Sequence, residues 1–208
     1  MKSKKTVGLL GNLRGLNRKL NVDLPELGFV PFEIDSGDLA HPPGTVAVIC
    51  GTENLESISR LIESLQDDHV QLVFVSMAKT NHPETQLADI GRLDFQAETL
   101  IRESGLTYTI VRAMGGDARP GNHRKIFWKQ DLGGDQNGQQ NPVPWEDLAQ
   151  VLVHCVNRSQ AISKTFTVHA VAGEPPIDSS RVSTEYWDRW FHGLSADSPV
   201  PTSRRKSA

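Results

Sequence analysis

Short apolar runs alternate with helix-like segments along most of this chain, and this alternation is the feature that most constrains its fold. The strand-like runs are Thr6–Leu10, Phe29–Ile34, Thr45–Cys50, Val70–Met77, Leu106–Arg112 and Thr165–Val171. The helix-like segments are Gly15–Leu27, Leu55–Leu65, Ala88–Ser104, Val143–Val156 and Glu185–His192. Strands that alternate with helices predict βαβ units, and therefore an α/β fold with a doubly wound, mostly parallel sheet and helices on both faces.

The length of 208 residues suits one well-buried core and is short for two domains. We therefore expect a single domain over residues 1–195, followed by a disordered C-terminal tail at residues 196–208. Residues 114–143 are rich in Gly, Asn, Asp and Gln and carry one short apolar segment, Ile126–Trp128. A stretch of this kind covers a ligand or stays mobile. Ligands of doubly wound sheets bind at the carboxyl ends of the strands.

Composition and charge exclude several classes of function. Charged residues make up 23% of the chain and the net charge is -3, so we expect no nucleic-acid partner and no membrane association. The apolar runs are too short to span a bilayer, and the basic N-terminus lacks the apolar stretch of a secretory signal, which predicts a cytoplasmic protein. Cys50 and Cys155 make no disulfide framework, and the histidines lack metal-ligand spacing, so no metal site is expected.

A glycine-containing turn follows the first strand, with the sequence Gly-Asn-Leu-Arg-Gly-Leu-Asn. Glycines at such a turn let the backbone approach a pyrophosphate, and the N-terminus of the following helix offers N–H groups to it. The turn resembles the Gly-x-x-x-Gly-x-Gly turn of the short-chain dehydrogenase/reductase family, with Gly11, Arg14 and Gly15 in register. Asn17 replaces the third glycine, and Asp35 falls where the family has an acid after the second strand.

This resemblance implies a dinucleotide-binding site made of Gly11, Arg14, Gly15, Asn17, Asp35 and Gly51. In the family the acid binds the adenosine ribose of NAD, whereas an arginine placed like Arg14 favours NADP. Both signals are present, so NAD and NADP both stay open as cofactors. A side chain at Asn17 crowds the helix against the strand or narrows the space for phosphate. The alternative is that Gly11 and Gly15 only form a turn.

A second resemblance, to the atypical NmrA-like branch of the same superfamily, spans residues 71–171. It rests on a strand that ends in Ser76, a helix that carries Glu98, the sequence Ser-Gly-Leu-Thr-Tyr-Thr-Ile-Val-Arg at residues 104–112, and a later Asp-Leu-Ala helix. It implies a single-domain, NAD(P)-binding, Rossmann-like fold. Residues 36–44 are much shorter than the corresponding part of the family, as if one βα unit had been removed.

The catalytic pair of the family is missing from this chain. Its chemistry needs a Ser or Thr and a Tyr-x-x-x-Lys pair, in which the lysine and the cofactor lower the pKa of the tyrosine. When the helix is registered on Glu98, Ile90 stands where the tyrosine is expected and Asp94 where the lysine is expected. Ser76 is in place. Standard hydride chemistry between a ketone and an alcohol is therefore not expected.

A different polar set stands near the same strand ends, and it consists of Ser76, Lys79, Asn81, His82 and Asp94. Ser76, His82 and Asp94 are the candidate catalytic residues, because an imidazole or a desolvated carboxyl group can exchange protons. Lys79 and Arg112 are candidate substrate-binding residues, since a guanidinium can clamp a carboxylate or phosphate. The alternatives are that the loop residues and Asp94 are solvated, and that Arg112 is structural.

The segment Tyr186–His192 is dense in aromatic residues, which is typical of a C-terminal helix docked on the core. A substrate pocket or a homodimer contact is the alternative, because Trp and Tyr are enriched at interfaces. We expect Trp128 and Trp145 to belong to the core.

Three functions are consistent with these features. The first is a small-molecule enzyme that has kept the pocket, lost the redox step and catalyses proton transfer, as isomerases, dehydratases and cyclases do. The second is a non-catalytic, NAD(P)-binding regulatory protein. The third is an NAD(P)H-dependent reductase with an unorthodox proton donor. The sequence leaves open whether the chain is an enzyme, and it carries no trace of the substrate.

Overall fold

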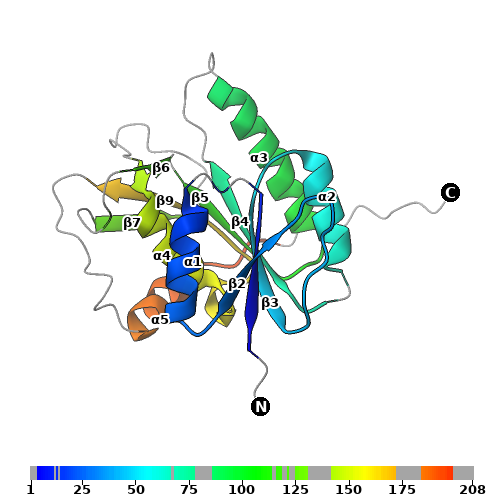
Figure 1. Ribbon diagram of the computed structural model, residues 1–208. Coiled ribbons are helices and arrows are strands. Elements are labelled where there is room, and N and C mark those ends of the chain that lie inside the picture. The colour runs from blue at the N-terminus through cyan, green and yellow to red at the C-terminus, as the bar shows by residue number, and fades with distance from the viewer. Residues whose placement is uncertain are drawn as a thin grey trace.

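A seven-stranded sheet with helices on both faces forms the centre of the molecule (Figure 1). The structure is a computed structural model, and it describes residues 4–11, 13, 15–66, 68–77, 86–113, 116–118, 121, 125–130, 142–171 and 184–198 of the chain.

The strands follow the order β2-β1-β3-β4-β5-β9-β7 across the sheet. They are β1 Thr6–Leu10, β2 Val30–Ile34, β3 Thr45–Gly51, β4 Gln71–Met77, β5 Tyr108–Ala113, β7 Lys125–Lys129 and β9 Lys164–Val171. All neighbours pair in parallel except β7, which runs antiparallel to β9. A separate two-stranded sheet pairs β6 Gly116–Asp117 with β8 Val143–Pro144.

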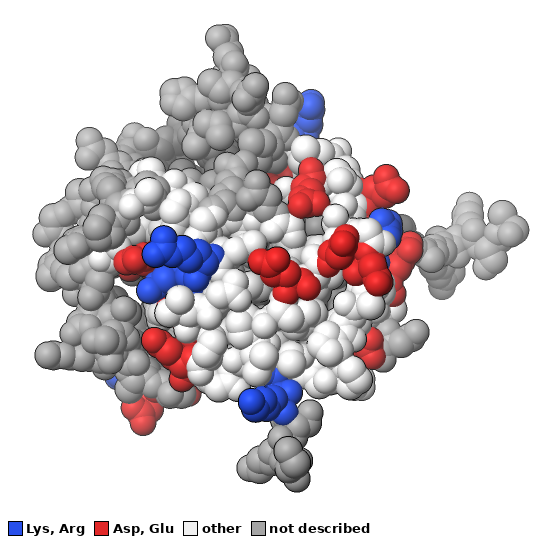
Figure 2. All heavy atoms as spheres, viewed as in Figure 1, with Lys and Arg blue, Asp and Glu red and all other residues white. Residues whose placement is uncertain are grey.

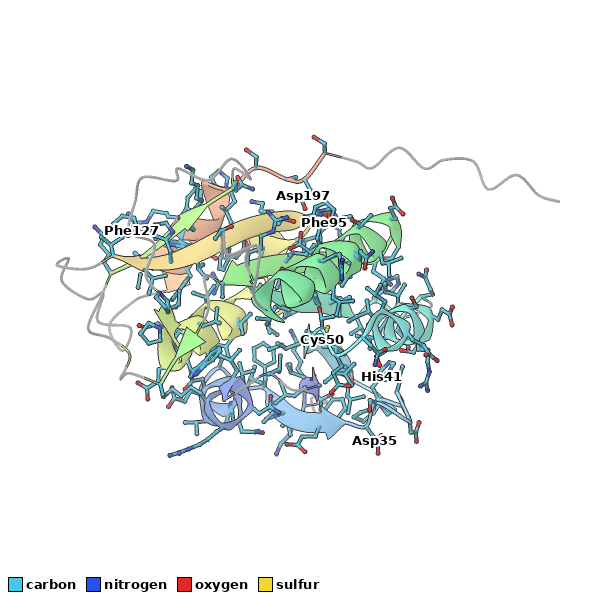
Figure 3. All side chains as sticks on the ribbon, turned by 90° about the horizontal axis from the view of Figure 1, so that it is seen from above. Asp35, His41, Cys50, Phe95, Phe127 and Asp197 are labelled. Atoms are coloured by element: carbon cyan, nitrogen blue, oxygen red, sulfur yellow. The ribbon has the colours of Figure 1, made fainter. Side chains whose placement is uncertain are left out.

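The helices cover the two faces of the sheet in two groups. The first group is α1 Leu16–Glu26, α4 Trp145–Cys155 and α5 Thr184–His192. The second group is α2 Leu55–Ser64 and α3 Gln86–Glu103. A 3-10 turn, Ser159–Ala161, precedes β9. Seen from above in Figure 3, α1 and α4 lie on one side of the strands, and α2 and α3 lie on the other.

Alternating side chains along each strand divide the core into two clusters. In β4, Val73 and Val75 pack with the residues of α1 and α4, whereas Leu72 and Phe74 pack with those of α2 and α3. All four side chains are buried. Because successive side chains of a strand point to opposite faces, a continuous apolar run supplies both clusters at once. The central strands are therefore apolar along their whole length because both of their faces are buried, which is typical of a parallel sheet.

The predicted α/β fold is confirmed, with its doubly wound sheet and its helices on both faces. All six predicted strands and all five predicted helices form, with bounds shifted by a few residues. The apolar segment Ile126–Trp128 lies inside β7, a strand that was not predicted.

The packed part of the chain extends past residue 195, where the predicted domain ends. Asp197 accepts hydrogen bonds from the hydroxyl groups of Tyr108 and Thr165. The remainder of the predicted tail, residues 199–208, lies outside the described residues.

The two edges of the sheet are formed by different kinds of strand. β7 closes one end as an antiparallel strand, near Phe127 in Figure 3. β2 is the last strand at the other end, and Asp35 follows it directly (Figure 3). Residues 35–44 connect β2 to β3 without a helix. This short connection agrees with the expectation that one βα unit is absent here.

Of the helices that the structure describes, none is long and apolar enough to cross a bilayer. On the face shown in Figure 2, the described basic side chains stand in small separate groups among acidic and uncharged residues, and they form no continuous basic surface there.

Candidate functional site

Two neighbouring strands, β1 and β3, end side by side at the centre of the sheet. The chain leaves β1 toward β2 on one side and leaves β3 toward β4 on the other, so the direction of winding reverses between them. Leu10 pairs with Cys50 at this end, which places Gly11 and Gly51 directly after partnered residues. A reversal of this kind is where open α/β sheets bind their ligands.

The turn between β1 and α1 requires its two glycines. Gly11 has a φ of +78° and Gly15 a φ of +109°, both in the left-handed region that other residues avoid. The N–H of Leu13 donates to the carbonyl of Gly11, and the N–H of Leu16 donates to that of Leu13, both at 3.0 Å. Gly15 caps α1 without a side-chain hydrogen bond, so this end of the helix suits an anion. Arg14 lies outside the described residues.

Side chains from two other elements lie against this turn. A Cβ atom on Gly11 would lie 3.3 Å from Cγ and 3.4 Å from Oε1 of Glu53, which follows β3. A Cβ atom on Gly15 would lie 3.5 Å from Cδ1 of Trp145, the first residue of α4. The same indole packs so closely on Gly116 that a side chain would not fit there. The turn therefore has a carboxylate and an indole as immediate neighbours.

Two buried polar atoms beside the turn have no hydrogen-bond partner within the described part of the chain. They are Oδ1 of Asn17, the second residue of α1, and Oγ1 of Thr52, which follows Gly51. Buried polar groups are nearly always hydrogen-bonded, so each orphan atom needs an explanation. A polar ligand in the crevice would provide one.

Asp35 stands at the carboxyl end of β2, where the ribose-binding acid was predicted. Its Oδ1 accepts a hydrogen bond from the N–H of Gly37 at 2.7 Å. Arg60 of α2 donates to the carbonyls of Ser36 at 3.3 Å and Gly37 at 3.0 Å. These bonds hold the loop after β2 in place and keep the exposed carboxylate at the end of the strand.

Ser76 of β4 and Arg112 of β5 are both turned toward Glu98 of α3. Arg112 donates from Nε to Oε1 of Glu98 at 2.8 Å and from Nη2 to Oε2. Ser76 hydrogen-bonds to the same carboxylate. Arg112 is 6% exposed, and the other two are 2% exposed. The structure thus places Arg112 in a buried ion pair, the structural role that was the alternative to substrate binding.

The environment of Glu98 keeps its carboxylate charged. Burial acts to raise the pKa of Glu98, but the hydrogen bonds and charge of Arg112, together with Ser76 and Arg102, hold that pKa below its ordinary value. Arg102 donates from Nη2 to Oε2 of Glu98 at 2.9 Å. Its Nε lies 3.6 Å from Oδ2 of Asp197, so the network reaches the C-terminal segment.

Asp94 lies one helical turn before Glu98 on the face of α3 that packs on the sheet. It is 3% exposed. Of the three predicted catalytic residues, the structure therefore places Ser76 and Asp94 and finds both buried. The others of this set, Lys79, Asn81 and His82, lie outside the described residues, as does the side chain of Ile90.

The aromatic helix α5 docks on the core. Trp187 is 7% exposed and Phe191 is fully buried. His154 of α4 stacks on Trp187 with ring centroids 4.4 Å apart. Trp128 and Trp145 are partly buried and pack against the same cluster, in agreement with their predicted core positions.

Known proteins resemble this chain in structure and not in sequence. No protein-family model matches the chain, and no curated protein matches it by sequence. A Bacillus halodurans protein, provisionally designated an NAD-dependent epimerase/dehydratase, superposes with a TM-score of 0.68 at 16% identity over 89% of this chain and 99% of that one. A Rossmann-fold NAD(P)-binding family protein from Shigella flexneri gives 0.60 at 14% identity, over 84% and 98%. A Streptococcus pneumoniae protein, provisionally designated an NADH-flavin reductase, gives 0.59 at 12% identity, over 80% and 100%.

At these identities the likeness establishes the fold. The protein is a single Rossmann-type α/β domain whose sheet contains the strand order 2-1-3-4-5, with a glycine turn where the winding reverses.

Three residues at the turn were not among the predicted site residues. Thr52 and Glu53 directly follow β3, and the convergence of parallel strand ends is a signal that could have found them. Trp145 is far from the turn in sequence, and its approach to Gly15 depends on how α4 packs on α1. No local pattern predicts that contact.

Proposed function

We propose that this chain binds NAD or NADP at the turn between β1 and α1, as an NmrA-like relative of the short-chain dehydrogenases/reductases that has lost the redox pair. The turn itself carries the proposal: two positive-φ glycines at the winding reversal, bordered by the buried, unpartnered Asn17 Oδ1 and Thr52 Oγ1 of the described chain. The likeness to solved proteins designated as NAD-dependent or NAD(P)-binding supports it.

The residues present fit a dinucleotide. The Gly11–Gly15 turn and the N-terminus of α1 would hold the diphosphate, because backbone N–H groups and the helix dipole favour negative charge there. Asp35 would accept from the adenosine ribose, and Thr52 would donate its hydroxyl proton. The other proposed contacts are Arg14, Asn17 and Gly51. When bound, NAD(P) supplies a hydride acceptor or donor.

The reaction we propose is proton transfer on a small-molecule substrate, of the isomerase, dehydratase or cyclase type. Asp94 supports it, because a buried carboxyl group at the position of the family's lysine can exchange a proton but cannot stabilise a phenolate. In this proposal Asp94 moves the proton and Ser76 binds the substrate oxygen. His82 and Lys79, between β4 and α3 in sequence, would add a proton donor and a cation.

Isothermal titration calorimetry with NAD⁺, NADH, NADP⁺ and NADPH tests the binding site. We expect at least one of them to bind, and Thr52→Val to weaken that binding about tenfold, because a hydrogen bond worth roughly 1.5 kcal/mol is lost. Thr45→Val is the matched control, since Thr45 lies at the opposite end of the same strand and bonds to Thr6. Failure of all four dinucleotides to bind would contradict the proposal.

Hydrogen exchange at carbon tests the reaction across many compounds at once, so the substrate does not have to be identified first. The protein is incubated in D₂O with a panel of sugar nucleotides and small carbonyl compounds, and mass spectrometry records deuterium uptake. We expect uptake into at least one compound, and a loss of about 100-fold or more in Asp94→Asn with dinucleotide affinity unchanged. Undiminished uptake in that variant would remove Asp94 from the proposed role.

A non-catalytic, NAD(P)-binding regulatory protein is the second candidate. It is favoured by the bonds that Ser76 and Arg112 make to Glu98, because polar groups already paired within the protein have less to offer a substrate. Dinucleotide binding without any deuterium uptake or turnover would select this function. Oxidation of NADPH that depends on added flavin or carbonyl compound would instead select the reductase, for which the likeness to the S. pneumoniae protein is an additional reason.

A further inference from the structure

Glu53 lies where the diphosphate of a bound dinucleotide would approach the backbone. A Cβ atom on Gly11 would be 3.4 Å from both Cδ and Oε1 of this side chain, so the carboxylate lies beside the first glycine of the turn. The residue itself is exposed, so its carboxylate is open to solvent beside the turn.

The backbone on which Glu53 sits is held by the start of α2. Asn54 is the N-cap of this helix, and its side chain accepts a hydrogen bond from the N–H of Ser57 at 2.8 Å. An N-cap of this kind stabilises a helix start by about 1 kcal/mol, so it resists displacement. A ligand at the turn must therefore either displace the Glu53 side chain or bind next to its negative charge.

The first turn of α1 contains no acidic residue, so Glu53 brings a negative charge that this helix start otherwise lacks. A carboxylate within a few ångströms of a diphosphate opposes binding, because like charges at that distance repel even in water. The family's turn is built to attract phosphate, and here a residue of the chain itself works against that attraction.

We infer that Glu53 is a specificity-determining residue, which lowers the affinity of the crevice for each ligand according to the phosphate charge that the ligand brings to the turn. The inference rests on the proposed dinucleotide site. Its consequence is a dinucleotide that binds weakly and exchanges readily, while the adenosine part alone is not penalised.

Calorimetry on the full chain tests this inference with NAD⁺ and adenosine as probes and with Glu53→Gln as the variant. We expect Glu53→Gln to bind NAD⁺ about tenfold more tightly than the unmodified chain at low salt, and to bind adenosine equally well. Glu63→Gln is the matched control, because Glu63 is an exposed glutamate in the last turn of α2, the helix whose start follows Glu53. It should bind NAD⁺ as the unmodified chain does.

Ionic strength separates charge repulsion from steric obstruction. Between about 50 mM and 500 mM NaCl, the advantage of Glu53→Gln for NAD⁺ should shrink to about two- to threefold, since salt screens an exposed charge. Equal NAD⁺ affinities in all three proteins would overturn the inference and leave the proposed site standing. An advantage that also appears for adenosine, or does not change with salt, would overturn it as well. If none of the proteins binds NAD⁺ or NADP⁺, the proposed site and the inference both fail.

Discussion

At the scale of single residues, Glu98 is the group that Ser76, Arg102 and Arg112 share. Breaking a buried ion pair leaves an uncompensated charge in a medium that solvates it poorly, whereas replacing both partners by apolar groups costs little. The Glu98–Arg112 pair joins α3 to β5. The main effect of this ion pair is therefore to fix the position of α3 relative to β5.

Replacing Glu98 by Gln should lower the free energy of unfolding by about 3 kcal/mol, because Arg112 would stay charged and buried without its partner. The double variant Glu98→Leu/Arg112→Met should recover most of that loss. Urea denaturation at neutral pH measures both. If the double variant lost as much as the single one, packing and not charge would hold α3 in place.

His154 makes stability depend on pH. Burial, assisted by the charge of Arg158, lowers the pKa of His154 to about 4 from an ordinary value of 6.5. The unfolded chain therefore binds this proton first, and the free energy of unfolding should fall as the pH drops from 6.5 through 4. We expect a loss of roughly 2 to 3 kcal/mol over this window, after allowance for partial solvation.

Guanidinium denaturation at several pH values measures that loss. His154→Phe keeps a ring stacked on Trp187 and should flatten the dependence. His192→Gln, at an exposed position of α5, should keep the wild-type slope. Equal slopes in all three proteins would show that other groups cause the pH dependence.

At the scale of elements, the carboxylate of Asp197 is one of the ties between the sheet and the segment after α5, alongside the hydrogen bonds between Ser195 and Gln130. Oδ2 of Asp197 accepts from Tyr108 Oη at 3.0 Å and from Thr165 Oγ1 at 2.6 Å, and Oδ1 accepts from the Thr165 N–H at 3.0 Å. Burial, and then the charge of Asp197, raises the pKa of Tyr108 to about 12. The titration of Tyr108 therefore reports on whether Asp197 is hydrogen-bonded to it.

Asp197→Ala should lower the free energy of unfolding by about 2 kcal/mol, because three hydrogen bonds are lost. It should also lower the pKa of Tyr108, since the neighbouring negative charge that opposes phenolate formation is gone. Tyrosinate absorbance measures this pKa, and Tyr108→Phe assigns the signal. An unchanged tyrosine titration would mean that the segment is not held through Asp197.

The strands differ in whether a local sequence pattern predicts them. The six parallel strands could be predicted because each is a short β-branched run with local turn signals. β7 could not, because its five residues are half-buried and pair with β9 some forty residues later, which no local pattern encodes. At the site, the same limit separates Gly11, Gly15 and Asp35, which stand in a local motif, from Trp145, whose place depends on packing between helices. The role of Arg112 could not be decided from the sequence, because a strand end suits either role.

At the scale of the whole molecule, β2 exposes one edge of the sheet. The N–H of Val30 donates to Lys5, on the β1 side, so the next residue along the strand, Pro31, faces the open edge. Proline has no N–H to offer to a further strand, and this is a common protection of sheet edges. Val30 is 39% exposed at the same edge, so the protection covers an apolar position.

Pro31→Val should therefore promote self-association, because it restores an outward N–H beside an exposed valine. Sedimentation velocity over a range of protein concentrations should show a larger associated fraction than the unmodified chain. Adding Val30→Lys to the same variant should reverse the effect by placing a charge at the edge. Association that persists in the double variant would point to another surface.

The position of Trp145 gives the protein a built-in optical probe. The chain contains four tryptophans, and three of them form one cluster, in which the ring centroid of Trp190 lies 5.7 Å from that of Trp128 and 5.6 Å from that of Trp187. Within the described part of the chain, Trp145 makes no aromatic ring contact with these three, and its indole lies beside Gly15. Emission from the cluster should follow unfolding, whereas emission from Trp145 should change when the crevice is filled. Folding and occupancy can thus be recorded separately in the same cuvette by comparison with Trp145→Phe.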